Sequence, residues 1–246
     1  MIVLHMYWNI TERKQFEDAI FELKFQVAKK IGIRRGMTVV DMGCGQGGFT
    51  VSTARIVGEL GKVLSVDVSD EYLAEFTENL SKWRVKNIVT FIKADAASLK
   101  DALADGIGDM VVSYRFLEEL KHAEDMNGIV KEMARTVKEN GKVCIVEIST
   151  QPRNEAENNY VRLHKESGDS LFEPDKIMAA LKQAGLSQTT VETFDTNLWF
   201  SPSLAKQDLG FAQIWYTPEV EETLGALIEK YGMKYPRLLM HYGVKE

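Results

Sequence analysis

A glycine-rich loop between a strand and a helix constrains this chain more than any other feature. Residues 39–50 read VVDMGCGQGGFT: an apolar strand that ends at Asp41, then glycines, then the start of a helix. Because glycine lacks a Cβ atom, the backbone can turn sharply there and come close to a ligand. The helix start adds free N–H groups and the positive end of a dipole. We therefore expect a nucleotide-like cofactor to lie across this loop.

The glycines satisfy two patterns at once. Gly43, Gly45 and Gly48 give the G-x-G-x-x-G of dinucleotide-binding folds, whereas Gly43, Gly45 and Gly47 give G-x-G-x-G. Asp41 favours the second pattern, because a carboxylate at the strand end would repel a pyrophosphate but would suit a cofactor with an ammonium and a sulfonium group. The alternative is that Asp41 only accepts hydrogen bonds from backbone amides of the loop.

Two further predicted strands also end in acids. Residues 62–67 form a short apolar strand that ends at Asp67, and residues 89–95 form another that ends at Asp95. An acid in the place of Asp67 can accept hydrogen bonds from both hydroxyls of a ribose, whichever cofactor carries it. Three acids at successive strand ends are a more specific signal than any one of them, because open α/β sheets bind ligands at the carboxyl ends of their strands.

These motifs resemble those of class I methyltransferases that use S-adenosylmethionine (SAM), over roughly residues 36–200. The resemblance implies that Asp67 lies at the ribose, that Asp95 and its neighbour hold the adenine edge, and that Ser113 offers its backbone carbonyl to the methionine amino group. The cofactor-binding residues so implied are Asp41, Gly43, Gly45, Gly47, Asp67, Val68, Asp95, Ala96 and Ser113. Within the superfamily the chain looks most like the small-molecule group near the quinone-biosynthesis C-methyltransferases. The implied reaction is in-line attack of an acceptor nucleophile on the sulfonium methyl.

The segment after the fourth predicted strand departs from the family pattern. Tyr114 stands where an Asn is frequent, and Glu118 and Glu119 replace a frequent His pair. Many such enzymes use no strong general base. Polar groups expected on the open side of the sheet are the catalytic candidates here: Glu118, Tyr114, Glu147 and His164. Roles on a helix surface, at a sheet edge or in a loop are the alternatives for these side chains.

Alternating strands and helices up to about residue 150 predict a parallel sheet with right-handed crossovers. With the resemblance, the expected fold is α/β and Rossmann-like: a seven-stranded, mostly parallel sheet with an antiparallel last strand and helices on both faces. We expect the last strand at 237–245, with 211–216 as the alternative. The other expected elements are a helix that ends at 138–141, a fifth strand at 141–148, an irregular stretch at 150–172, a helix at 173–185 and a sixth strand at 189–194.

We expect residues 1–246 to form a single methyltransferase domain, because the chain can bury one substantial core and leaves little length for a second domain. Residues 11–30 predict an amphipathic helix that either closes over the cofactor or packs on the sheet edge. Residues 201–235 predict a mostly helical insertion that acts as a lid. The aromatic residues near this insertion are Trp199, Phe200, Phe211, Trp215 and Tyr216.

Composition limits the partners. The net charge is −6 with no long basic run, which argues against nucleic acid as the main substrate. The sequence shows no membrane span, no signal-peptide pattern, no disulfide framework and no metal-binding spacing. We expect a cytoplasmic enzyme with a small-molecule acceptor; the oligomeric state is left open, a homodimer included. The alternatives are an NAD(P)-binding oxidoreductase, and a SAM-fold protein that binds the cofactor without turnover or methylates a protein partner.

Overall fold

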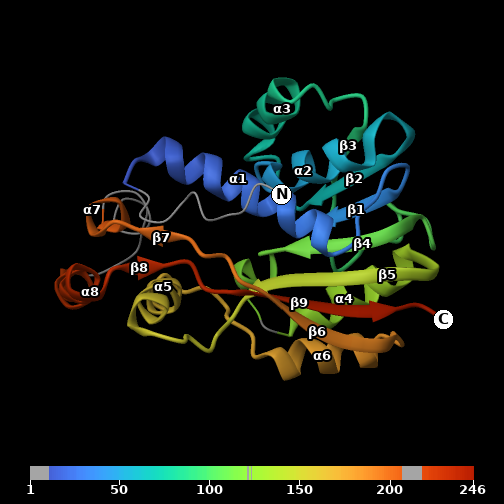
Figure 1. The fold of residues 1–246 in the computed structure, drawn as a ribbon. Coiled ribbons are helices and arrows are strands. Elements are labelled where there is room, and N and C mark those ends of the chain that lie inside the picture. Colours follow the sequence, from blue (N-terminus) through green and yellow to red (C-terminus); the bar gives the residue numbers. More distant parts are fainter. Residues whose placement is uncertain (1–10, 121, 123, 207–217) are drawn as a thin grey trace.

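The computed structural model describes residues 11–120, 122, 124–206 and 218–246. These residues build a seven-stranded sheet in the order β3-β2-β1-β4-β5-β9-β6 (Figure 1). The strands are β1 (Thr38–Met42), β2 (Lys62–Asp67), β3 (Val89–Lys93), β4 (Gly108–Tyr114), β5 (Val137–Ile148), β6 (Ser187–Phe194) and β9 (Leu238–Val244). Strands β1 to β5 pair in parallel, and β9 pairs antiparallel with both β5 and β6. The predicted mostly parallel sheet with an antiparallel last strand is confirmed.

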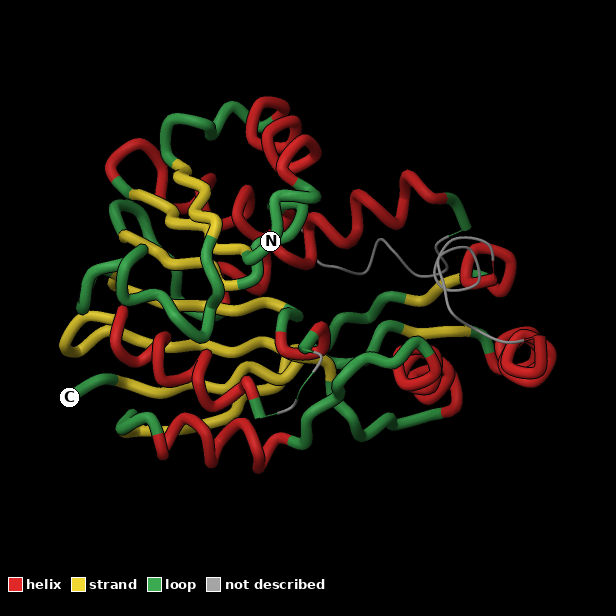
Figure 2. The backbone as a smooth tube through the Cα atoms, turned by 180° about the vertical axis from the view of Figure 1, so that it is seen from behind, coloured by secondary structure: helices red, strands yellow, loops and turns green. Residues whose placement is uncertain are grey.

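Helices cover both faces of this sheet (Figures 1 and 2). On one face lie α1 (Arg13–Lys30), α2 (Gly48–Val57) and α3 (Leu73–Lys82), and on the other lie α4 (Asp125–Thr136) and α6 (Pro174–Gln183). Because side chains alternate along each strand, the sheet contributes to two separate apolar clusters, one under each helical layer. The functional loops are therefore held at the edge of a sheet that is packed on both sides.

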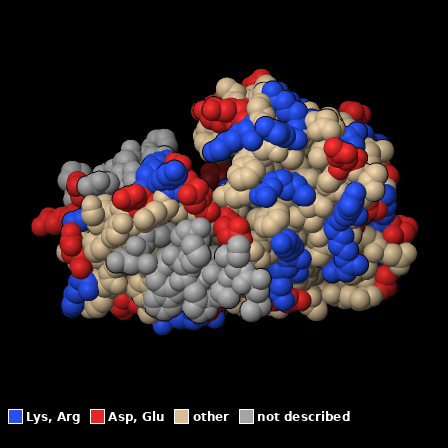
Figure 3. Space-filling model, turned by 45° about the horizontal axis from the view of Figure 1, so that its top comes forward, with Lys and Arg blue, Asp and Glu red and all other residues tan. Residues whose placement is uncertain are grey.

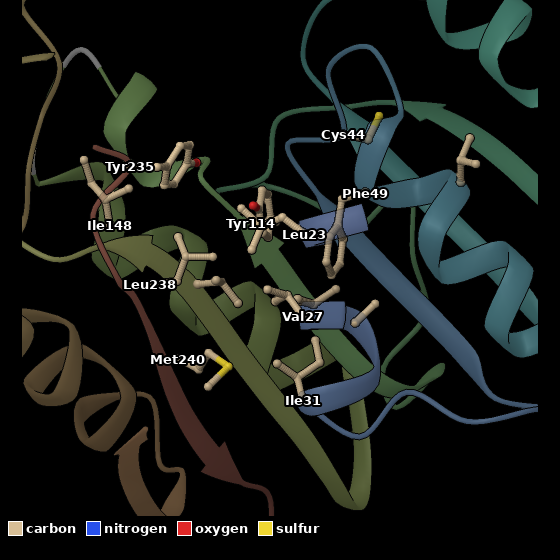
Figure 4. Packing of buried hydrophobic residues seen from close by; sticks show 14 of the residues in the cluster. Leu23, Val27, Ile31, Cys44, Phe49, Tyr114, Ile148, Tyr235, Leu238 and Met240 are labelled. Carbon is tan, nitrogen blue, oxygen red and sulfur yellow. The ribbon is translucent and has the colours of Figure 1, made fainter. Parts of the chain in front are cut away.

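Helix α1 packs on the sheet beside α2. Leu23, Val27 and Ile31 point toward the sheet, where Tyr114 and Met240 lie (Figure 4). Leu23 and Val27 are fully buried, as the three- and four-residue spacing of the apolar side chains predicts. This packing fixes the rotation of α1 about its axis, and with it the side chains that face the carboxyl ends of the strands.

A smaller group of elements lies beyond the carboxyl ends of the parallel strands (Figure 1). It consists of α5 (Glu155–Glu166), α7 (Pro202–Leu204), α8 (Pro218–Tyr231) and the paired strands β7 (Trp199–Phe200) and β8 (Met233–Lys234). The alternative last strand at 211–216 and the aromatic residues Phe211, Trp215 and Tyr216 lie outside the described residues. Within the part of the chain described here, no helix has the length and apolar character needed to cross a membrane.

Two local predictions are wrong. The stretch 150–172 is not irregular, because residues 155–166 form α5, whose first turn is capped by Asn154 accepting a hydrogen bond from the N–H of Glu157 at 2.9 Å. The helix before the fifth strand does not reach residue 138. It ends at Thr136, whose hydroxyl bonds back to the carbonyl of Glu132 at 2.7 Å, and the extended strand begins with the next residue.

Candidate active site

A cavity of about 830 Å³ lies at the carboxyl ends of β1, β2 and β4, a size typical of cofactor sites. Figure 3 shows a hollow in the surface with Asp and Glu side chains gathered at its edge. Nine of the residues predicted for the site line the cavity: Asp41, Gly43, Gly45, Asp67, Val68, Asp95, Ala96, Tyr114 and Glu118. The other four, Gly47, Ser113, Glu147 and His164, are not among its lining residues.

The three glycines of the G-x-G-x-G pattern have different structural reasons. All three have positive φ, namely +71° at Gly43, +47° at Gly45 and +79° at Gly47. A Cβ atom at Gly43 would lie 2.2 Å from the ring of Phe116, and one at Gly47 would lie 2.6 Å from the ring of Phe76. At Gly45 a Cβ atom would meet nothing within 4 Å. Gly43 and Gly47 thus make room for side chains, while Gly45 presents bare backbone to the cavity.

The end of β2 holds this loop in place. The carboxylate of Asp67 accepts a hydrogen bond from the N–H of Gly45 at 2.8 Å and another from the N–H of Ser69 at 3.1 Å. The N–H groups of Gly43 and Cys44 both donate to the carbonyl of Val66, the residue before Asp67 on β2, at 2.9 and 3.0 Å. Asp67 therefore positions the loop as well as facing the cavity, and its remaining lone pairs are available to hydroxyl donors.

Asp95 follows β3 and has an exposed side chain at the cavity, whereas Ala96 beside it is buried. One carboxylate oxygen of Asp95 accepts from the N–H of Ala97 at 2.9 Å. The carbonyl of Asp67 accepts from the N–H of Ala94 at 2.9 Å, so the ends of β2 and β3 are tied together. The carboxylates that follow three successive strands thus meet at one cavity.

Asp41 lies at the base of the glycine loop and is 1% exposed. It accepts a hydrogen bond from the hydroxyl of Thr50 at 2.6 Å, and not from a loop amide as the alternative held. Burial raises the pKa of Asp41 to about 7, although the Thr50 hydrogen bond and the charge of Lys24 lower it. A carboxyl whose pKa is strongly raised by burial, at the wall of a cavity, is a candidate for a functional residue.

The loop after β4 carries a buried cluster centred on Arg115. Arg115 has φ of +50° and donates hydrogen bonds to the hydroxyls of Tyr160 and Tyr235, at 2.8 and 2.7 Å. It also pairs with Glu118 at 2.5 Å. Tyr160 comes from α5 and Tyr235 from the segment after β8, so the cluster joins the sheet to the elements beyond it. Only the left-handed backbone at Arg115, which no sequence signal indicates, brings these groups together.

The four catalytic candidates occupy different places. Tyr114 and Glu118 line the cavity, and the Oε2 atom of Glu118 is buried without a hydrogen-bond partner in the described part of the chain. Glu147 lies behind the loop and accepts from the N–H groups of Phe116 and Leu117 at 3.2 and 2.9 Å. His164 is held by a hydrogen bond to Asp169. Of the four, Tyr114 and Glu118 combine a place at the cavity with a buried polar atom, the Tyr114 hydroxyl and Glu118 Oε2, that has no hydrogen-bond partner among the described residues.

The geometry agrees with what comparison with known proteins finds. A family model described as a methyltransferase domain matches residues 33–193, which is more than half of the chain. The chain belongs to this methyltransferase family. The glycine loop and the acids that follow β1, β2 and β3 all fall within the matched range. The match favours the G-x-G-x-G interpretation of the loop over the dinucleotide one.

Curated relatives carry out C-methylation. The chain is similar to a ubiquinone/menaquinone biosynthesis C-methyltransferase of Klebsiella pneumoniae, with 31% identity over 119 residues, or 48% of this chain and 45% of that protein. It is also similar to a sterol 24-C-methyltransferase of Gibberella zeae, with 26% identity over 240 residues, or 93% of this chain and 58% of that protein. The chain thus spans about half the length of the curated relatives it matches.

Solved structures share the fold. A cyclopropane-fatty-acyl-phospholipid synthase-like protein from Lactobacillus casei has a TM-score of 0.71 and 16% identity, covering 96% of this chain and 95% of that one. A SAM-dependent methyltransferase from Aquifex aeolicus has a TM-score of 0.58 and 18% identity, covering 91% and 89%. At these identities the likeness shows the fold alone. That fold is the Rossmann-like fold of class I methyltransferases, as the sequence motifs predict.

Proposed function

We propose that this chain is an enzyme that transfers a methyl group from SAM to a small-molecule acceptor. The observation that carries the proposal is the meeting of Asp41, Asp67 and Asp95 at one cavity, beside the bare backbone of Gly45. When bound, SAM supplies an electrophilic methyl group on a sulfonium centre. The protein's own part is to bind, orient and exclude water.

The residues present fit SAM from end to end. Asp95 and Ala96 would hold the adenine edge, and Asp67 with Val68 would hold the ribose, because hydroxyl donors can use the remaining lone pairs of its carboxylate. Asp41 would face the ammonium group. Gly47 would act through the shape of the loop. Ser113 would act through its backbone carbonyl, at the end of β4.

The acceptor would bind beside the aromatic side chains of the cavity and Glu118. The lining residues outside the glycine loop and the three strand-end acids include Phe16, Ile20, Tyr114, Phe116, Glu118, Tyr160 and Tyr235. Burial raises the pKa of the Tyr114 phenol well above its usual value, so Tyr114 stays neutral and serves as a hydrogen-bond donor. Glu118 would accept a hydrogen bond from an O–H or N–H group of the acceptor. Glu147 and His164 would position the loop and the Arg115 cluster.

The electrostatics support a neutral or cationic acceptor. Carboxylates at the cavity outnumber the cations: Asp41, Asp67, Asp95, Glu118, Glu119 and Asp125 against Lys24 and Arg115. Such a field opposes a ligand with net negative charge, such as the pyrophosphate of NAD or NADP. Tyr160 and Tyr235 come from the elements beyond the sheet, and their presence at the cavity supports the role of 201–235 as part of a lid over a small pocket rather than an open groove for a protein partner.

We propose a cytoplasmic location and no nucleic-acid substrate as parts of the same assignment. The free, buried thiols of Cys44 and Cys144 suit a reducing compartment, and the net charge of −6 opposes nucleic acid. The oligomeric state, monomer or homodimer, can be measured by light scattering.

The test is thermal unfolding with SAM, S-adenosylhomocysteine (SAH), NAD and NADP side by side. A ligand at a hundred times its Kd stabilises the folded state by about 2.7 kcal/mol, which raises Tm by roughly 5–10 °C for a chain of this size. We expect this shift with SAM and SAH only. A shift with NAD or NADP instead, or with none of the four, would reject the methyltransferase assignment.

A further inference from the structure

One cation in the cavity has no counter-ion. Lys24 of α1 lines the cavity, and it forms no hydrogen bond or ion pair with any residue in the described part of the chain. Its Nζ atom lies 5.9 Å from the centroid of the Tyr114 ring. It also lies against the backbone of Gly48, where a Cβ atom would be 2.6 Å away. The ammonium group therefore sits beside the glycine loop and the ring of Tyr114.

The surroundings of this ammonium group are electropositive. Gly48 is the first residue of α2, and the N-terminal N–H groups of a helix carry a partial positive charge. Burial lowers the pKa of Lys24 to about 8, Arg115 lowers it as well, and Asp41 raises it. Two cations and a helix start converge here, and Asp41 is not within ion-pair distance of Lys24. Such a combination is typical of a site for an anionic group.

Arg115 is not available to that group. Its guanidinium already binds the hydroxyls of Tyr160 and Tyr235 and the carboxylate of Glu118. Each of these partners is buried, so their removal from Arg115 would leave buried polar atoms without partners. Among the described residues that line the cavity, Lys24 is therefore the cation that can pair with an anion without breaking a hydrogen bond or ion pair.

We propose that Lys24 binds the carboxylate of the amino-acid end of SAM, across from Asp41, which faces the ammonium of the same group. This assignment rests on the proposed function. The amino-acid end of SAM is a zwitterion, and Asp41 and Lys24 offer one charge of each sign at the glycine loop. Helix α1 thereby becomes part of the cofactor site, because the same helix that packs Leu23 and Val27 on the sheet carries the cation.

Removal of the ligand carboxylate provides the test. Decarboxylated SAM keeps the adenosine, the sulfonium and the amino group, so that a comparison with SAM isolates the carboxylate. We expect the wild-type protein to bind SAM about ten- to a hundredfold more tightly than decarboxylated SAM, the usual range for a hydrogen bond to a charged group. The Lys24→Met variant should lose this preference and bind the two compounds within about twofold of each other. Lys14→Met, at an exposed position of the same helix, is the matched control and should keep the preference.

Each outcome of the calorimetric titrations decides one point. If wild type binds neither compound, the proposed function fails. If wild type binds both equally, or if Lys24→Met keeps the wild-type preference, the assignment of Lys24 is wrong and the cofactor stands. If Lys24→Met weakens both compounds by the same factor, Lys24 supports the cavity without contacting the carboxylate, and the assignment is again wrong. Affinity for decarboxylated SAM also reports that the variant is folded.

Discussion

At the scale of single residues, Asp41 weakens the ligand-free fold. A carboxyl whose folded pKa is raised, here from 3.8 to about 7, adds stability that is present below about pH 4 and is lost as the pH rises through 7. The Asp41→Asn substitution removes the ionisable group, and with it this loss of stability. The amide oxygen of the Asn side chain can still accept a hydrogen bond from the Thr50 hydroxyl. At pH 8 we expect the ligand-free variant to exceed wild type in free energy of unfolding by about 1–3 kcal/mol, while SAM binds at least about tenfold more weakly.

Urea titrations at pH 4 and pH 8, with calorimetric SAM titrations at pH 8, check this prediction for Asp41. The pH comparison matters because at pH 4 Asp41 is protonated in the folded state and only partly ionised in the unfolded state, so most of the destabilisation is absent and the two proteins should differ little. An equal difference at both pH values would show that the buried charge is not its cause. Undiminished SAM affinity would remove Asp41 from the cofactor site.

Asp67 should affect the nucleoside part of the cofactor instead. Asp67→Ala removes the acceptor for ribose hydroxyls and the partner of the Gly45 N–H, so we expect SAH and 5′-methylthioadenosine, which share the ribose, to lose affinity by similar factors of about thirty or more. Asp70→Ala, which removes an exposed carboxylate paired with Lys93, is the control. Calorimetric titration measures both ligands. A loss confined to SAH would place Asp67 at the amino-acid end and overturn the ribose assignment.

The site residues that the sequence predicted are those marked by a local sequence pattern. Asp41, Asp67 and Asp95 end predicted strands, and the sheet rule brings strand ends together. Lys24 had no such signal. The spacing of apolar residues gave the inner face of α1, but how far the helix extends over the glycine loop depends on its packing against α2. Contacts set by the docking of one element on another are not encoded in a short stretch of sequence.

At the scale of elements, one side chain of β5 fixes the loop after β4. Glu147 accepts from two backbone N–H groups of that loop, and the ring of Phe116 in the same loop packs over Gly43. Glu147→Ala would leave both buried N–H groups without an acceptor, so we expect a loss of about 2–4 kcal/mol in free energy of unfolding. The loop would also lose its position over the glycines, and SAM affinity should fall.

Glu147→Gln is the matched control, because an amide oxygen keeps both hydrogen bonds. Burial, and then Glu118, raise the pKa of the Glu147 carboxyl above its usual 4.5. The stability that this carboxyl contributes is therefore present below about pH 4.5 and lost as the pH rises. Urea titrations should find the Gln variant close to wild type at pH 5 and more stable than wild type at pH 8. If Glu147→Gln were as unstable as Glu147→Ala, the two hydrogen bonds that the side-chain oxygen accepts from the loop would not be the cause of the stabilisation.

Helix α5 is joined to β8 by buried charges. The side chain of Glu157 is fully buried and accepts from the ammonium of Lys234 and from the guanidinium of Arg153, at 2.9 and 2.8 Å. Glu157→Ala leaves the buried Lys234 with only the more distant carboxylate of Asp195, at 3.9 Å, among the described residues, so we expect a loss of about 3 kcal/mol in free energy of unfolding. The double variant Glu157→Leu with Lys234→Met removes both charges and should recover most of that loss in chemical denaturation. A double variant no more stable than Glu157→Ala would show that packing, not the unpaired charge, causes the effect.

The same buried charges explain why α5 was missed. Its buried face mixes apolar residues (Ala156, Tyr160 and Leu163) with the polar residues Glu157 and Asn159, so the apolar pattern of this helix is diluted. A local signal did exist: Asn154 followed three residues later by Glu157 is a helix-start pattern, and the structure uses it. Periodicity predicted α1, whose inner face is apolar, and it is weaker in a helix whose buried face also carries polar and charged residues.

At the scale of the whole molecule, the order of strands places the last strand of the described chain inside the sheet. Strand β9, near the C-terminus, lies between β5 and β6, so the sheet is complete only when the last strand has been inserted. Leu238 at the start of β9 pairs with Ile148 at the end of β5, which brings the segment after β8 directly to the cavity. Tyr235 in that segment binds Arg115 of the loop after β4. We therefore propose that the sheet and the elements beyond its carboxyl ends are one domain.

A single domain should unfold in one step, and the cofactor should stabilise all of it. We expect differential scanning calorimetry to give one transition whose calorimetric and van't Hoff enthalpies agree, and a hundredfold excess of SAH over its Kd to move the entire transition upward by roughly 5–10 °C. Tyr235→Phe tests the coupling, because it removes a hydrogen bond to Arg115 and keeps the ring. It should lower Tm by a few degrees and leave one transition. A second transition that SAH does not move would mean that the elements beyond the sheet fold separately, and the closure of the cavity by α5 and the segment after β8 would then have to be maintained by binding rather than by the fold.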